Sequence, residues 1–376
     1  MKASIRLGRI WGIELGLHFS WIVIALLITF SVAQQFSTTN PEWGPQVIWS
    51  AAVLTGVLFF AALFAHELSH AFVAKMRGLP IRRITLFLLG GVAQVEKEAE
   101  DPATEFWMAI VGPIMSAIVG AICLGAALAL GWQPGHPPAS PLTAITVWLG
   151  YINVALAAFN MIPGFPLDGG RVLRAVIWWI NHDKRRSTLI AARVGEVIAA
   201  LFIGWGIFRF FAGAGLSGLW IAFIGWFLMQ AASASYLQTE ASAALRGLRA
   251  GDMMSRECGV VSAGMNLRDF VDRELLRTGR RCFIVVDDGH MAGMVTPHEI
   301  KSVPAEQWAD TPIAGVMVPT SRIHAITPDT PADEALELMG REDINQVPVV
   351  ADGRLEGVLT RGHLLQVLRS RAELRR

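Results

Sequence analysis

Two histidines and a glutamate in one apolar stretch have the types and spacing of a metal-dependent hydrolase. They are His66, Glu67 and His70, in the pattern H-E-x-x-H. Residues four apart share a helical face, so both imidazoles can bind one metal ion. Two neutral imidazoles suit Zn²⁺, and a carboxylate can complete three protein ligands while one position stays open for water. Such a metal activates the water, and Glu67 can then act as the general base.

The residues before this motif argue against a solvated surface helix, in which H-E-x-x-H also occurs. The run Val47–Ala65 contains no charged residue. Ionisable side chains at membrane depth are energetically costly and usually functional. We therefore favour a metal site within a membrane-spanning helix.

The third ligand is expected to be an Asp, Glu or His from another span, and Asp168 is the best candidate. It lies in a segment with two prolines and three glycines, Asn160–Arg171, which ends a later apolar run. These residues break a helix, so we expect Asp168 on irregular backbone at the cytoplasmic edge of the membrane. An Asp-Gly pair is also a common turn, so Asp168 by itself could be a simple turn residue.

The elements that position these residues are mostly apolar. Of 376 residues, 53% are hydrophobic and 17% are charged, and the mean hydropathy is +0.45. This composition excludes a disordered or fibrous protein and argues against a single soluble globule. Six runs are predicted to be membrane helices: Leu17–Val32, Val47–Phe72, Phe106–Leu130, Ala144–Ile162, Leu189–Phe211 and Leu216–Tyr236.

Charge predicts the orientation of these spans. Lys and Arg gather before the first span and in alternate connections. Basic connections favour the cytoplasm, so we expect a multi-pass protein of the cell (inner or cytoplasmic) membrane with both termini cytoplasmic and with lipids as neighbours. The net charge of +1 offers no strongly basic surface, so nucleic acid is not expected as a partner.

Between the second and third spans, Ile81–Glu96 is too short and too rich in glycine to cross a membrane. It predicts a strand or β-hairpin around Gly90 and Gly91 that dips into the membrane domain. Such backbone is tolerated at that depth only where protein or water shields it. The glycine pair is equally compatible with a plain turn.

The long apolar runs end near residue 240, and the sequence after this point contains an internal repeat. Gly293–Thr296 corresponds to Gly357–Thr360, and each copy predicts strand, helix, strand, Asp-Gly turn, strand and helix. We therefore predict a polytopic α-helical membrane domain over 1–240 and an α+β pair over 248–305 and 312–370.

Together, H-E-x-x-H and the later N-x-x-P-x-x-P-L-D-G-G resemble the site-2 protease family of intramembrane zinc metalloproteases. The resemblance implies one Zn²⁺ per chain, held by His66, His70 and Asp168, with Glu67 as catalytic base. It also implies that Asn160 helps to hold substrate or the oxyanion, and that Gly90 and Gly91 belong to a hairpin that pairs with an unwound substrate. Gly112 and Pro113 resemble a helix-kinking motif of the family, which we interpret as packing.

The repeated half resembles a tandem pair of CBS domains, which often bind adenine nucleotides in the cleft between the copies. The positions that match the family's nucleotide contacts are Thr296 and Glu299, and Thr360 and His363. Neither copy has the family's aspartate three residues after the threonine. An alternative is that the pair only dimerises or docks, for example in a homodimer.

These observations predict a zinc metalloendopeptidase that carries out regulated intramembrane proteolysis of single-span membrane proteins under the control of its CBS domains. The alternative from another class is a membrane transporter or channel regulated by CBS domains. The two motifs together favour the protease, because a transporter needs no open zinc site. The presence of Glu67 also argues against a proteolytically inactive relative that only binds clients.

Overall fold

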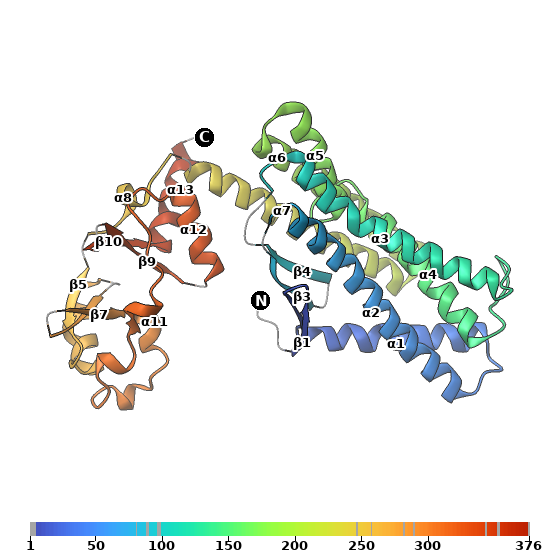
Figure 1. The fold of residues 1–376 in the computed structure, drawn as a ribbon, viewed down its shortest axis with the longest axis horizontal. Helices are drawn as coiled ribbons and strands as arrows, with labels where there is room; N and C mark the ends of the chain where they lie inside the picture. The colour runs from blue at the N-terminus through green and yellow to red at the C-terminus, as the bar shows by residue number, and fades with distance from the viewer. Residues whose placement is uncertain are drawn as a thin grey trace. The chain divides into compact units, whose positions relative to one another are not determined.

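Two units make up the chain, Met1–Leu237 and Gln238–Arg376. The computed structural model describes residues 5–79, 81–87, 90–95, 99–245, 247–256, 258–280, 283–288, 290–342, 344–351 and 354–374. Figure 1 shows the chain as a ribbon and labels most of its helices and strands.

The first unit is built from long apolar helices. Six of them are long and apolar enough to cross a membrane, which confirms the predicted number of spans. Many of their large apolar side chains point outward, such as Leu26 at 66% and Leu201 at 66% exposure, as expected for lipid-facing surfaces. The helices are α1 Ser20–Thr39, α2 Pro45–Met76, α3 Pro102–Ala129, α4 Pro141–Asn160, α6 Lys184–Arg209 and α7 Leu216–Leu245, of which Leu216–Leu237 belongs to this unit.

Small residues let these helices approach one another closely. A Cβ on Gly206 of α6 would lie 2.3 Å from the backbone nitrogen of Ala222 on α7. Close backbone packing at glycine is a common way to associate helices in lipid, where hydrophobic burial between helices is weak.

The expected irregular backbone at Asp168 is wrong, because Asp168 is the first residue of a helix, α5 Asp168–Asn181. The helix is strongly amphipathic, and this periodicity outweighs the Gly-Gly pair that follows Asp168. Gly169 is needed here for close approach, since a Cβ there would lie 2.4 Å from the carbonyl oxygen of Ile162.

A four-stranded sheet accompanies the helices, near the beginning of α1 (Figure 1). Its strands are β1 Ile5–Ile10, β2 Ile13–Leu17, β3 Ile81–Phe87 and β4 Gly90–Val95, in the order β1-β2-β3-β4. β2 and β3 run parallel, and the other two pairs are antiparallel. The sheet packs on α2 beside the metal-binding motif, because Ile13, Leu15 and Ile84 share a buried cluster with Ala71.

Only half of this sheet was expected from the sequence. The β3–β4 pair agrees with the predicted hairpin, although residues 88 and 89 between the strands lie outside the described residues. The β1–β2 hairpin was not predicted. Its turn residues Trp11 and Gly12 have φ of 52° and 82°, as a two-residue hairpin turn of the I′ type requires.

The second unit contains two similar α+β halves, each around its own apolar core. The first half contains β5 Gly259–Ser262, α9 Leu267–Asp269, α10 Leu276–Thr278, β6 Phe283–Asp287, β7 His290–Val295, α11 Pro297–Ile300 and β8 Val318–Pro319, and its four strands form one sheet in the order β5-β6-β7-β8. The second contains α8 Ala250–Met253, whose Ala250 and Met253 pack in its core, together with α12 Ala332–Arg341, β9 Gln346–Ala351, β10 Arg354–Thr360 and α13 Arg361–Leu374. Met294 of β7 and Val358 of β10 pack together and join the halves. The predicted Asp-Gly turn at 352–353 lies outside the described residues.

Candidate metal centre

Two helices that are distant in sequence bring three donor atoms together. His66 and His70 lie one turn apart on α2, with their Nε2 atoms 3.2 Å from each other. The Oδ2 atom of Asp168, at the start of α5, lies 3.2 Å from each of these nitrogens. The three predicted ligands therefore form a nearly equilateral triangle of donors.

This triangle has the dimensions of a zinc site. Donors at about 2.0–2.2 Å from a tetrahedral zinc ion lie roughly 3.3 Å from each other. Both histidines are buried, at 3% and 8% exposure. Two imidazoles and one carboxylate are a ligand set of catalytic zinc, which leaves a coordination position for water. The donor chemistry and spacing thus both fit Zn²⁺.

The other ring nitrogens of the histidines are held by α3. His66 Nδ1 lies 2.9 Å from Ser116 Oγ, and His70 Nδ1 donates to the Met108 carbonyl oxygen at 2.5 Å. A hydrogen bond at Nδ1 fixes the ring orientation and leaves Nε2 as the metal-binding nitrogen. The backbone and side chains of α3 therefore orient both imidazoles.

The surroundings of Asp168 favour the ionised form of its carboxyl group, which is the form that binds a metal ion. Burial by itself would raise the pKa of its carboxyl group, but the polar interactions with the imidazoles of His66 and His70 outweigh burial and lower the pKa below its usual range. The carboxylate is therefore ionised at neutral pH, as metal binding requires.

Gly112 of α3 lies directly against the two imidazoles, a role that the sequence analysis missed. A Cβ at this position would lie 2.2 Å from His70 Nε2 and 2.7 Å from His66 Nε2. The interpretation of Gly112 as a packing residue was therefore incomplete. The signal in the sequence was a glycine directly before the proline inside α3, but without a structure nothing indicated what approached it.

The remaining predicted residues of the membrane unit lie on three different elements. Glu67 follows His66 on α2 and is partly buried. Asn160 is the last residue of α4 and is partly buried, and residues 161–167 lead from it to Asp168. Gly90 and Gly91 begin β4, where they pair with Phe87 and Leu86 at an edge of the described sheet.

Four residues of the second unit were predicted to contact a nucleotide, and the structure separates them into two pairs. Thr360 and His363 line a cavity of about 500 Å³, together with Thr278 and Arg280 from the other half. Glu299 instead accepts hydrogen bonds from the backbone nitrogen and hydroxyl of Thr296, at 2.8 and 2.5 Å.

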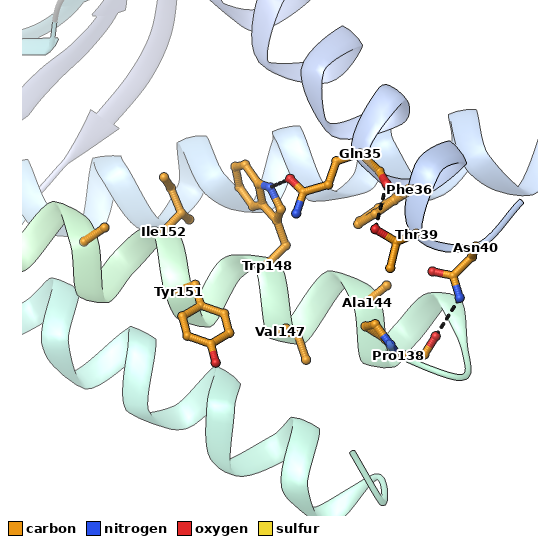
Figure 2. A pocket seen from close by; sticks show the side chains of 11 residues that line it. Gln35, Phe36, Thr39, Asn40, Pro138, Ala144, Val147, Trp148, Tyr151 and Ile152 are labelled. Carbon is orange, nitrogen blue, oxygen red and sulfur yellow. Dashed lines mark hydrogen bonds between the residues drawn. The ribbon is translucent and has the colours of Figure 1, made fainter. Parts of the chain in front are cut away.

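A second cavity lies in the membrane unit, away from the metal centre (Figure 2). It has a volume of about 330 Å³ and lies between the end of α1 and α4. Trp148 Nε1 donates to Gln35 Oε1 at 3.2 Å across it, and Asn40 Nδ2 donates to the Pro138 carbonyl oxygen at 2.8 Å. Its lining residues do not include the three metal donors, so this hollow is not part of the metal centre.

Comparison with known proteins gives consistent similarities along the chain. The model of peptidase family M50 matches residues 54–134 and 133–202, and the CBS domain model matches 250–306 and 314–370. A protein of Synechocystis that carries the provisional name of zinc metalloprotease is 32% identical over 99% of this chain and 97% of its own. A protein of Mycobacterium tuberculosis with the same provisional name is 32% identical over 96% and 91%. The solved site-2 protease of Methanocaldococcus jannaschii is 29% identical, with a TM-score of 0.41 over 62% of this chain and 94% of that one.

Proposed function

The chain belongs to peptidase family M50, the site-2 proteases, with a tandem CBS pair in its C-terminal half, and we propose that it cuts client proteins within their transmembrane segments. It is a multi-pass membrane zinc metalloprotease. The observation that carries the proposal is the triangle of His66, His70 and Asp168 donors inside a unit of membrane helices.

His66, His70 and Asp168 would hold one Zn²⁺, and this ion would supply the Lewis acidity that activates water toward a peptide carbonyl. The Glu67 carboxylate accepts a proton from the attacking water and delivers it to the leaving amine. The Asn160 amide donates a hydrogen bond to the developing oxyanion. The β4 edge that begins at Gly90 and Gly91 pairs with the unwound client segment and exposes its carbonyls.

We also propose where the protein lies in the cell and how its domains are organised. The chain lies in the cell membrane with both termini in the cytoplasm, surrounded by lipid, and its clients are single-span membrane proteins. The protease domain extends over 1–240, and the CBS domains over 248–305 and 312–370 regulate it and can form a homodimer. The alternating basic connections of the sequence support this orientation.

The test is cleavage of a panel of single-span substrates by the purified full-length protein in liposomes. We expect products cut within the membrane segment, loss of cleavage with a zinc chelator, and recovery when zinc is added back. Zinc content gives an independent readout, expected at one ion per chain. Cleavage that persists after all zinc is removed would contradict the proposal.

For the second unit we propose an adenine nucleotide in the cavity lined by Thr360 and His363. Arg280 on the same cavity can pair with a phosphate group, and the Thr360 hydroxyl can hydrogen-bond to it. Thr296 and Glu299 are assigned the weaker role, because Glu299 already accepts two hydrogen bonds from Thr296.

This assignment predicts that Arg280→Ala weakens ATP or AMP binding by roughly 10- to 100-fold, because it removes a charge-assisted hydrogen bond worth roughly 1.5–3 kcal/mol. Thr296→Ala is the control in the other half and is expected to change affinity by less than about twofold. Isothermal titration calorimetry of the full-length protein measures both. Equal losses in the two variants would refute the assignment to this cavity.

A further inference from the structure

One face of α3 contacts both histidine donors. Ser116 hydrogen-bonds to His66, the Met108 carbonyl accepts from His70, and Gly112 packs against both imidazoles. Glu105 lies on the same face, three residues before Met108 and seven before Gly112. Ser116 and Met108 therefore orient the two histidines, and Glu105 is the remaining polar residue of this face that could orient Asp168.

Glu105 is the only residue of this face with a full charge, and it is almost completely buried, at 1% exposure. Its Oε1 atom accepts a hydrogen bond from Arg171 Nε at 3.0 Å and another from Arg174 Nη2 at 2.5 Å. Both arginines belong to α5, the helix that begins at Asp168. A buried carboxylate of α3 is therefore bonded to the first two turns of the helix that supplies the third donor.

One of these arginines, Arg174, also contacts the segment before Asp168. The Arg174 guanidinium lies over the ring of Phe165, 5.4 Å from its centre. Phe165 is itself buried, and its backbone nitrogen donates to the Ala191 carbonyl oxygen of α6 at 3.3 Å. The start of α5 is thus fixed on the side of α3 by Glu105 and on the side of α6 through Phe165.

We infer that Glu105 is a positioning residue for the metal centre, which sets the Asp168 carboxylate at bonding distance from both histidines through Arg171 and Arg174. The inference rests on the proposed zinc site. Residues that orient metal ligands typically change metal affinity by 10–100-fold when they are replaced. Glu105 completes the set on α3, because each of the three donors then has its own support on this helix.

The test is a double-mutant cycle on zinc affinity, measured by competition with a chromophoric chelator on the full-length protein in detergent. Glu105→Gln keeps the size of the side chain and removes its charge, and we expect zinc affinity to fall by about 10–100-fold. In an Asp168→Ala background the same change is expected to alter affinity by less than about threefold, because the ligand through which Glu105 acts is gone. Equal losses in both backgrounds would show a general structural role and overturn the inference.

Two further measurements sharpen this result. Glu196→Gln is the matched control, since Glu196 also pairs with an arginine, Arg193, at 2.9 Å in the same unit. It is expected to leave zinc affinity within about twofold of the wild type, whereas a loss equal to that of Glu105→Gln would count against the inference. Cobalt substitution gives a spectroscopic readout, with a changed visible spectrum expected for Glu105→Gln and an unchanged one for Glu196→Gln.

If Glu105→Gln does not accumulate as folded protein, Arg174→Lys is the smaller change. It keeps the charge and removes the guanidinium geometry, and the cycle with Asp168→Ala is then run from the α5 side. The wild-type protein separates the two hypotheses. Absence of zinc binding by the wild type would reject the proposed metal site, whereas tight binding by the wild type and by Glu105→Gln alike would reject only the positioning role.

Discussion

Glu67→Gln is expected to reduce cleavage of a membrane substrate by roughly 10²–10⁴-fold while zinc stays bound. The amide of Gln is nearly the same size as the carboxylate but cannot accept the proton of the attacking water. The donors His66, His70 and Asp168 are untouched, so the metal should remain. The rate of cleavage in liposomes and the zinc content of the same sample measure the two effects separately.

Zinc content decides how this result is interpreted. Loss of both cleavage and zinc would mean that Glu67 supports the metal rather than the proton transfer. Cleavage at the wild-type rate would point to another active site or to a contaminating protease. A matched change on α2 is Gln46→Glu, which introduces a carboxylate near the other end of the helix and should leave both readouts close to the wild type.

Gly112→Ala is expected to abolish zinc binding and with it all cleavage. The added methyl group would lie 2.2 Å from His70 Nε2, a distance that real Cβ contacts do not reach. The imidazoles cannot retreat easily, because their Nδ1 atoms are bonded to Ser116 and to the Met108 carbonyl. Either the rings rotate away from the donor triangle, or α3 moves and takes those hydrogen bonds with it.

Gly125→Ala is the matched control on the same helix, because nothing lies within 4 Å of a Cβ at that position. Helix propensity favours alanine over glycine by up to about 1 kcal/mol at either position, so propensity cannot explain a difference between the variants. Zinc content and thermal unfolding of both proteins measure the effect. Full zinc occupancy in Gly112→Ala would show that the two rings can shift and would contradict the predicted clash.

The features that the sequence predicted are those encoded in local patterns. The six spans follow from long apolar runs, and the tandem repeat follows from the recurrence of Gly-x-x-Thr strand ends. The donors His66 and His70 follow from helical spacing alone. The sequence motif predicted Asp168 as the third donor, but it did not predict the helix that begins at this residue. The Gly-Gly pair indicated a break in the helix, and the amphipathic periodicity of α5 outweighed it.

What the sequence could not supply are contacts between segments that are distant along the chain. Glu105 is one carboxylate at the beginning of an apolar run, and nothing near it indicates its pairing with Arg171 and Arg174. Gly112 is one of 36 glycines, and its importance depends on which side chains meet it. The β1–β2 hairpin was not predicted from the sequence, because its partner strand β3 follows only after two long helices.

The metal centre has a consequence for how the protein is made. Two donors come from α2 and the third from the start of α5, about a hundred residues later, while α3 holds the histidine rings. A nascent chain that has inserted only its first four helices therefore has two of the three donors. If these three residues hold the zinc ion, we expect proteolytic activity only after α5 has packed against α2 and α3, and we expect the partly inserted chain to be inactive.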